Sequence, residues 1–284
     1  MIVAIVGPTG VGKTKMSIEL AKYLNAPIIN ADAVQIYKEL NIGSAKVTEE
    51  EKEGIKHYLI DLKSPDEMYT VKDYQEAARK ILQDYKDKNI IFCGGTGLYL
   101  CAALMDYRFY EDENNANYEN YSNEKLYELV LKKDSKTNID KNNRKRMIRF
   151  LNKKLVEIVE PKILYKDVIF IGLTTDRKKL YDIIDKRVDL MIASGLLEEV
   201  EKLYKKYPNS HVLNSAIGYK ELIGYIKGEY SLEEGIELIK KNSRHYAKRQ
   251  YTWFNNKMQV KWCNVNYDNF CDTIKEVKEY IDKW

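Results

Sequence analysis

The chain has 284 residues, of which 44% are hydrophobic and 32% are charged, a composition typical of a soluble globular protein. This length allows one large domain or a domain with an insert, and no apolar run approaches the roughly 18–20 residues that span a bilayer. The net charge is only +4, so any strongly basic surface must be local.

The four cysteines, Cys93, Cys101, Cys263 and Cys271, form no C-x-x-C pair and have no histidines at metal-binding spacing. This usage indicates reduced thiols. The apolar start carries no basic leader, so we expect a cytoplasmic protein without a membrane segment.

The first stretch has the pattern of a strand, a glycine-rich loop and a helix. An apolar run at 2–6 precedes the spacing G-x-x-x-x-G-K-T, and an amphipathic segment follows at 16–24. This spacing predicts a phosphate-binding loop in which backbone N–H groups and the start of a helix surround an anion. The predicted phosphate ligands are Gly7, Pro8, Thr9, Gly10, Val11, Gly12, Lys13 and Thr14. Lys13 supplies positive charge and the Thr14 hydroxyl can bind Mg²⁺, so ATP and GTP are the first candidate ligands.

Further strand-like runs at 27–30, 57–61, 90–93 and 168–173 alternate with helical patterns. Such alternation predicts an α/β fold with a parallel sheet of the P-loop type. A polar segment at 111–123, followed by helical patterns, interrupts it. We therefore expect a core of 1–105 and 166–284 with a helical insert domain at 106–165. The C-terminal part is expected to be helical, with a late strand at 260–265 and a closing helix at 269–283.

Asp32 follows the second predicted strand. Ligands in open α/β sheets lie at the carboxyl ends of the strands, so Asp32 is placed to face the phosphate site. There it could hold Mg²⁺ through water or accept a proton from a substrate. The alternative is an aspartate that caps a helix. Asp61, after the third predicted strand, is a competing carboxylate whose alternative is a turn or cap residue.

The fourth predicted strand runs into the glycines of 94–97. An ATP-driven motor more often ends such a strand in Asp or Glu, so this turn suggests close approach of a substrate; a plain strand-to-helix turn is the alternative. Arg187 lies in an apolar helical stripe without a carboxylate on its own face. It needs a distant partner, either a phosphate ligand or an interdomain salt bridge, unless its side chain reaches water.

Two basic stretches contain no acidic residue. Each of 141–154 and 240–261 carries seven Lys or Arg residues, and the second interleaves them with aromatic side chains. Lys240, Arg244 and Lys248 are predicted to line one helical face. A basic stripe beside stacking groups favours RNA binding over an ordinary solvated surface.

With these motifs in place, the chain resembles the bacterial tRNA dimethylallyltransferases over nearly its whole length. The resemblance rests on the segments 7–14, 31–37, 42–46, 57–61, 94–99, 187–189, 216–221 and 247–254. It implies transfer of a dimethylallyl group from dimethylallyl diphosphate to N6 of the adenosine 3′ to the tRNA anticodon. It implies that Asp32 accepts the N6 proton, that Lys13 and Arg187 neutralise the leaving diphosphate, and that Thr14 contacts Mg²⁺.

The resemblance also implies a set of contacts to the anticodon stem-loop of tRNA. They are Asp32, Ala33, Val34, Gln35, Thr96, Lys145, Arg146, Arg149, Gly218, Tyr219, Lys220, Lys248, Arg249 and Gln250. Three departures affect them. Ala33 replaces the usual serine, Asn143-Arg144-Lys145 replaces a commoner Asp-Pro-Gln, and the segment 111–123 has no clear counterpart. A monomer is expected.

Two other functions stay open. A prenyltransferase acting on free adenine nucleotides would need no such basic surface. An ATP-dependent small-molecule kinase, or a non-catalytic nucleotide- and RNA-binding protein, fits the phosphate loop. The glycine turn at 94–97 disfavours the kinase, and Lys13 together with Asp32 favours chemistry over binding alone.

Overall fold

The computed structural model describes residues 1–109, 117–135, 137–152 and 161–284. The chain forms two compact units. The first comprises Met1–Asp106 and Ile163–Trp284, and the second comprises Tyr107–Lys162. The insert was expected at 106–165, and the second unit spans 107–162.

A parallel six-stranded sheet with the order β3-β2-β4-β1-β5-β6 forms the centre of the first unit. The strands are β1 (Ile2–Val6), β2 (Ile28–Asn30), β3 (His57–Tyr58), β4 (Ile90–Cys93), β5 (Val168–Thr174) and β6 (Lys261–Asn264). The predicted α/β fold is confirmed. Every residue of β1 is buried, as expected for a central strand covered on both faces.

The third strand is shorter than predicted. It ends at Tyr58 because Leu59 and Asp61 have left-handed φ values of 61° and 55°, which extended backbone does not tolerate. The Asp61 N–H instead donates to the Gln35 carbonyl at 3.2 Å. This bond joins the segments that follow β2 and β3 at the carboxyl edge of the sheet.

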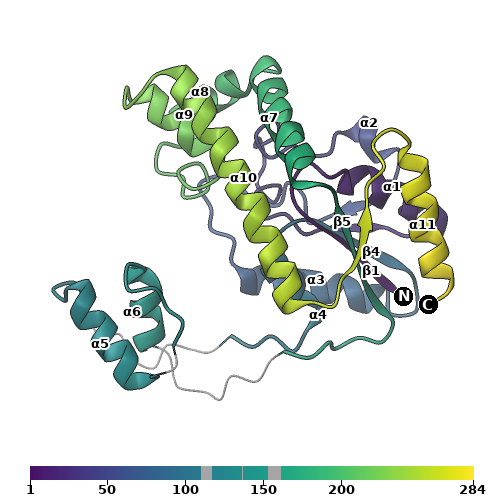
Figure 1. The fold of residues 1–284 in the computed structure, drawn as a ribbon, viewed down its shortest axis with the longest axis horizontal. Helices are drawn as coiled ribbons and strands as arrows, with labels where there is room; N and C mark the ends of the chain where they lie inside the picture. The colour runs from purple at the N-terminus through teal and green to yellow at the C-terminus, as the bar shows by residue number, and fades with distance from the viewer. Residues whose placement is uncertain (110–116, 136, 153–160) are drawn as a thin grey trace. The chain divides into compact units, whose positions relative to one another are not determined.

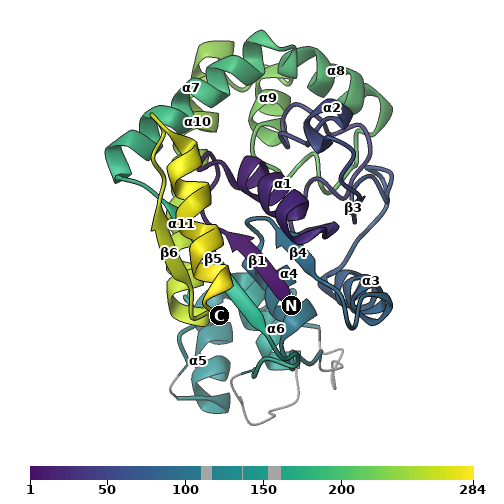
Figure 2. The same ribbon diagram turned by 90° about the vertical axis from the view of Figure 1, so that its right-hand side faces the viewer.

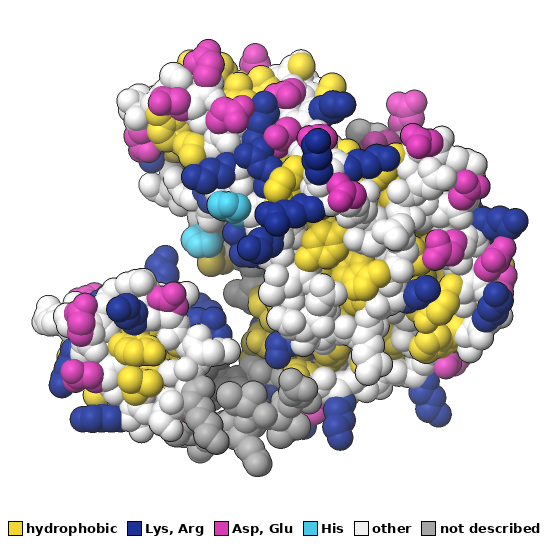
Figure 3. Space-filling view, viewed as in Figure 1, with side chains coloured by type: hydrophobic (Ala, Val, Ile, Leu, Met, Phe, Trp, Pro, Cys, Tyr) yellow, Lys and Arg dark blue, Asp and Glu magenta, His cyan; other side chains and the backbone are white. Residues whose placement is uncertain are grey.

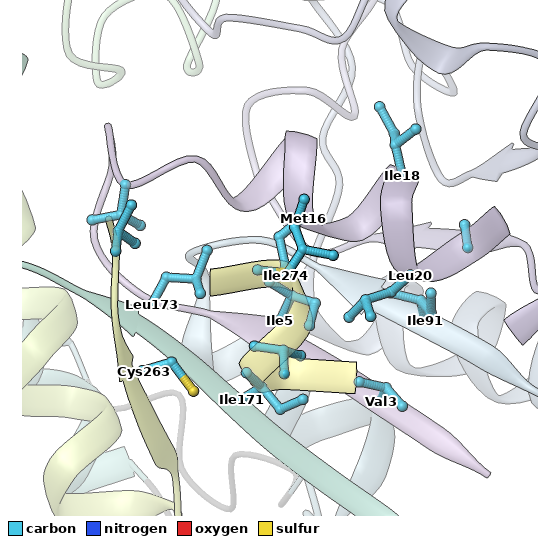
Figure 4. Packing of buried hydrophobic residues seen from close by; sticks show 14 of the residues in the cluster. Val3, Ile5, Met16, Ile18, Leu20, Ile91, Ile171, Leu173, Cys263 and Ile274 are labelled. Carbon is cyan, nitrogen blue, oxygen red and sulfur yellow. The ribbon is translucent and has the colours of Figure 1, made fainter. Parts of the chain in front are cut away.

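Two helices from opposite ends of the sequence pack on one face of the sheet. They are α1 (Lys13–Leu24) and α11 (Phe270–Asp282), and Figure 2 looks onto the sheet from their side. Met16 and Leu20 of α1 meet Val3 and Ile5 of β1 and Ile274 of α11 in a buried cluster (Figure 4). Burial of such side chains contributes about 1.5–3 kcal/mol each, so this cluster holds the phosphate loop onto the sheet.

Two helices, α3 (Val71–Asp84) and α4 (Gly97–Leu104), lie beside the sheet and pack against each other (Figure 1). The remaining helices of the first unit lie toward the carboxyl edge of the sheet, and one of them, α10 (Leu232–Lys257), runs from there to α4. They are α2 (Glu49–Lys52), α7 (Arg177–Ala193), α8 (Leu196–Lys206), α9 (Tyr219–Ile226) and α10. Glu199 of α8 ties several of them together. Its carboxylate accepts hydrogen bonds from the N–H groups of residues 41–43 and from the Tyr219 hydroxyl at 2.7 Å. This single carboxylate therefore fixes the loop after β2 against α8 and α9.

The second unit contains α5 (Asn123–Lys133) and α6 (Arg144–Asn152) around a small apolar cluster. The Arg144 guanidinium donates to the carbonyls of Tyr118 and Tyr121 at 2.7 and 2.5 Å, so it serves the fold of this unit. Part of the polar segment predicted at 111–123 lies outside the described residues.

All four cysteines are free thiols, as predicted. No helix in the described ranges is both long and apolar enough to cross a membrane.

Candidate active site

The phosphate loop has a backbone that only glycine readily adopts. Gly7, Gly10 and Gly12 have φ values of 135°, 89° and 89°. A Cβ on Gly7 would lie 2.5 Å from the Leu173 carbonyl oxygen of β5. The loop therefore sits directly against the neighbouring strand, and its shape is set before any ligand binds.

Lys13 begins α1, and its side chain curls back over the loop. Its Nζ donates to the Pro8 carbonyl at 2.7 Å. Burial is the main reason why the pKa of Lys13 falls to about 8; the positive charge of Arg187 contributes to the shift, and Asp32 opposes it. An anionic ligand would restore the charged form, which is how a phosphate-binding lysine is expected to behave.

Asp32 is fixed at the end of β2 by the side chain of Asn30, which is only 4% exposed. The Asn30 amide donates to the carbonyls of Asp32 and Leu59 and accepts from the Asp32 N–H. The Asp32 carboxylate accepts from the N–H of Val34 at 2.9 Å. It thus closes a turn and does not cap a helix, since the next helix begins at Glu49.

Arg187 is partly buried in α7, and burial lowers the pKa of its guanidinium, whereas the charges of Asp32 and Glu51 raise it. Within the described residues it forms no hydrogen bond or ion pair. An interdomain salt bridge, one of the alternatives above, is therefore not made among these residues. The guanidinium remains open to an anion.

Two adjoining cavities occupy the carboxyl edge of the sheet. The phosphate cavity, of about 290 Å³, is lined by the loop residues Gly10, Gly12, Lys13 and Thr14. The acceptor cavity, of about 450 Å³, extends from Thr96 to α7, α9 and α10. Both cavities are lined by Thr9, Asp32, Ser44, Arg187 and Tyr246. A carboxylate and a guanidinium therefore lie where the two spaces meet.

Most of the predicted tRNA contacts of the first unit line these cavities. Three of them, Gln35, Tyr219 and Gln250, have side chains that form hydrogen bonds within the protein. Besides Asp32, the predicted contacts in the acceptor cavity are Ala33, Val34, Thr96, Gly218, Lys220 and Arg249, and the Thr96 hydroxyl accepts from the Ala33 N–H at 3.1 Å. Tyr219 is completely buried, with its hydroxyl on Glu199. The Gln35 amide donates to the carbonyls of Ser44 and Ala45.

Gln250 is the third of these and is only 5% exposed. Its amide accepts from the Thr9 N–H at 2.9 Å and donates to the Gly95 carbonyl at 3.1 Å. The placement favours a positioning role, because this amide joins the phosphate loop to the glycine turn after β4.

The glycine turn at 94–97 makes close contacts, but with the protein itself. A Cβ on Gly94 would lie 2.3 Å from Ala31, and one on Gly97 would lie 2.0 Å from the Trp253 ring. The glycines therefore let β2 and α10 approach the turn. The suggestion that they admit a substrate backbone is not needed to explain them.

The basic stripe predicted on α10 is largely neutralised. Lys240 pairs with Asp189 at 2.8 Å, and Arg244 pairs with Asp185 at 2.5 Å. The acidic partners come from α7, so a search within the stripe itself could not find them. Lys248 is exposed, and Figure 3 shows lysine and arginine side chains gathered on the face where α10 runs.

Asp61, the competing carboxylate, forms an ion pair with Lys46 at 2.5 Å and lines neither cavity. In the second unit, Lys145, Arg146 and Arg149 lie exposed on α6. They remain predicted tRNA contacts.

Tyr246 is one of the aromatic side chains interleaved with the second basic stretch, and its place at the junction of the cavities was not predicted. Burial raises its pKa to about 12, and the negative charge of Asp32 adds to this. Its position one turn before Gln250 was the signal that could have indicated it.

Comparisons with known proteins agree with this architecture. A family model described as IPP transferase matches residues 35–257. The chain is 44% identical to the tRNA dimethylallyltransferase of Anoxybacillus flavithermus, over 99% of this chain and 96% of that protein. The tRNA dimethylallyltransferase of Bacillus anthracis is also 44% identical, over 99% and 95% of the two chains.

Solved structures give the same result. The tRNA isopentenylpyrophosphate transferase of Bacillus halodurans superposes with a TM-score of 0.76 at 38% identity, over 99% of this chain and 95% of that one. A eukaryotic dimethylallyltransferase described as acting on tRNA superposes with a TM-score of 0.82 at 25% identity, over 99% of this chain and 79% of that one.

The parallel sheet, the phosphate loop and the paired cavities define a P-loop-type α/β protein. Within that class, the chain belongs to the IPP transferase family.

Proposed function

We propose that the protein transfers a dimethylallyl group from dimethylallyl diphosphate to N6 of the adenosine 3′ to the anticodon of tRNA, and releases diphosphate. The observation that carries the proposal is the junction of the two cavities, where Asp32 and Arg187 both lie. One side of this junction fits an anion and the other side is large enough for a base. The tRNA dimethylallyltransferases that match the whole chain support the same reaction.

The donor diphosphate binds in the phosphate cavity. Backbone N–H groups of the loop, Lys13 and Arg187 balance its charge, and this stabilisation grows as the allylic C1–O bond breaks. The electron pair of that bond leaves with the diphosphate. Because the phosphate loop and α7 hold the leaving group, C1 is placed at the junction beside Asp32.

The acceptor adenosine leaves its stack and enters the acceptor cavity, as enzymes that modify a base require. The new N6–C1 bond forms while the Asp32 carboxylate accepts the N6 proton. The N–H groups of Val34 and Gln35 orient this carboxylate. An exocyclic amine is a poor nucleophile until a base takes its proton, so Asp32 is the residue on which the chemistry depends.

The phosphate cavity also fits Mg²⁺, since it offers the Thr14 hydroxyl and the Asp32 carboxylate as oxygen donors. Mg²⁺ commonly binds through one or two protein oxygens together with substrate phosphates and water. Thr14 would hold the ion, which would neutralise part of the diphosphate charge.

The exposed Lys145, Arg146 and Arg149 of α6, and Lys220, Lys248 and Arg249 of the first unit, are proposed to contact the phosphates of the anticodon stem-loop. We further propose that the protein acts as a monomer in the cytoplasm.

The decisive experiment supplies labelled dimethylallyl diphosphate with unmodified tRNA, with AMP, or with ATP and no RNA. We expect label in tRNA only. In the same assay, Asp32→Ala should abolish transfer and leave tRNA binding within a few-fold. Label in AMP alone would refute the tRNA reaction, and ATP consumption without any transfer would favour the kinase alternative. Full activity of Asp32→Ala would exclude Asp32 as the base.

A further inference from the structure

The first turn of α4 brings two hydroxyl side chains to the acceptor cavity. Thr96 precedes the helix, and Tyr99 is its third residue, with its N–H on the Thr96 carbonyl at 2.9 Å. Both line the acceptor cavity. Tyr99 is 5% exposed, so the small accessible part of its side chain opens into that space.

The Tyr99 ring is held in one orientation. Tyr74 of α3 stacks on it with the ring centroids 3.9 Å apart and the planes at 16°. Tyr74 is completely buried and its hydroxyl donates to the Asn30 carbonyl at 2.9 Å. Because one face of Tyr99 is covered by a ring that is itself fixed, the Tyr99 hydroxyl has a defined position.

That hydroxyl has no partner among the described residues. Tyr69, which lines the same cavity, also has an unpaired hydroxyl, but that atom is sealed from solvent, whereas the Tyr99 hydroxyl is not. A hydroxyl that opens into a cavity can bind water or a ligand group, so the Tyr99 hydroxyl is available to an acceptor atom of a ligand.

The same hydroxyl stays neutral. Burial raises the pKa of Tyr99 well above its usual value, and the negative charge of Asp32 adds to the shift. A phenol that keeps its proton can donate a hydrogen bond at any pH at which the protein works.

We propose that the Tyr99 hydroxyl donates a hydrogen bond to a ring nitrogen of the acceptor adenosine and is thereby a specificity-determining residue of the acceptor cavity. The inference rests on the proposed function. Adenine carries three ring nitrogens that accept hydrogen bonds and are not consumed by the reaction at N6. A fixed donor one helical turn from Thr96 gives a higher kcat/KM for a base that presents an acceptor there than for a base that does not.

The test removes the donor from the protein and the acceptor from the RNA in turn. Anticodon stem-loops carry adenosine, 1-deazaadenosine, 3-deazaadenosine or 7-deazaadenosine at the modified position, and kcat/KM is measured for wild type and Tyr99→Phe. We expect Tyr99→Phe to lose about tenfold on adenosine, as loss of one neutral hydrogen bond predicts. One of the three deaza RNAs lacks the ring nitrogen that accepts from Tyr99. For that RNA, Tyr99→Phe should cause no further loss of kcat/KM, so the protein and RNA changes are non-additive.

The matched control is Tyr74→Phe, which removes a hydroxyl from the stacked ring outside the cavity. It should keep the wild-type preference among the four RNAs. Binding of inorganic diphosphate by Tyr99→Phe should equal that of wild type, which separates a local contact from a folding defect. A wild-type rate for Tyr99→Phe on adenosine, or additive losses on all three deaza RNAs, would overturn the inference. Failure of wild type to modify any RNA would instead refute the proposed function.

Discussion

Replacement of Asn30 by alanine tests whether the base of the reaction is held by its neighbour. The Asn30 amide makes three hydrogen bonds, two to the backbone of Asp32 and one to the Leu59 carbonyl. Leu59 has a left-handed φ of 61°, so its carbonyl is turned toward β2 by a strained backbone. Asn30→Ala leaves these backbone groups without their partner and frees the segment that carries Asp32.

The expected cost is considerable for a single truncation. Each of the lost hydrogen bonds contributes about 0.5–1.5 kcal/mol, so the free energy of unfolding should fall by about 3 kcal/mol. The effect on the reaction comes from misplacement of the Asp32 carboxylate. A shift of about 1 Å in a reacting group can cost about 100-fold in rate. We therefore expect kcat to fall by roughly this factor, with the affinity for the donor little changed.

The measurement combines urea unfolding with single-turnover transfer of label to a tRNA anticodon stem-loop. Asn89→Ala is the matched control, because the Asn89 amide also donates to a backbone carbonyl, that of Leu24 at 3.0 Å, but lines neither cavity. It should lose about 1 kcal/mol of stability and keep its rate. If Asn30→Ala loses stability but transfers label at the wild-type rate, Asn30 serves the fold alone and the positioning argument is wrong.

Two further predictions follow from the phosphate loop and from the glycine turn. The Lys13 amine carries its charge below its pKa of about 8 and loses it above, so affinity for inorganic diphosphate should fall as pH rises through that value. Diphosphate itself also ionises in this range, so the affinity of wild type is divided by that of Lys13→Met at each pH. The range from pH 7 to 9 is chosen to flank the pKa by about one unit. A ratio of the two affinities that stays constant over this range would contradict the assignment. Gly97→Ala would place a Cβ 2.0 Å from the Trp253 ring and should destabilise the protein by about 1–3 kcal/mol in thermal or urea unfolding. Gly235→Ala is its control, since the nearest atom there is 3.5 Å away; that helix should be stabilised by up to about 1 kcal/mol, and equal effects of the two substitutions would refute the packing argument.

The sequence predicted the sheet well where strands are continuous apolar runs. The expected strands at 2–6 and 90–93 coincide with β1 and β4, because each is buried on both faces and bounded by glycine or polar residues. The prediction failed at β3, where the apolar run continues past Tyr58 with Leu59 and Ile60 but the backbone turns, with left-handed φ values at Leu59 and Asp61. Hydrophobicity marks burial in both cases, and only long-range pairing distinguishes a strand from a buried turn.

The site was predictable to the extent that topology alone fixes it. Asp32 could be placed because the carboxyl ends of parallel strands meet at one edge. The partners of α10 could not, since Gln250 binds Thr9, which lies 241 residues earlier, and Arg244 binds Asp185, 59 residues earlier. The sequence around Gln250 and Arg244 does not indicate either contact. A basic stripe therefore looked free in the sequence although α7 neutralises two of its members.

The position of α10 also explains why one fold can join two substrates. Gln250 spans the gap between the phosphate loop and the turn that carries Thr96, and it does so with one planar amide. Trp253 and Gly97 fix the same turn from the other side. In the proposed reaction, side chains of this single helix would therefore set the distance between the leaving diphosphate and the adenine that attacks. A phosphate loop of this shape serves nucleotides in other proteins; here its use depends on what α10 and Asp32 place next to it.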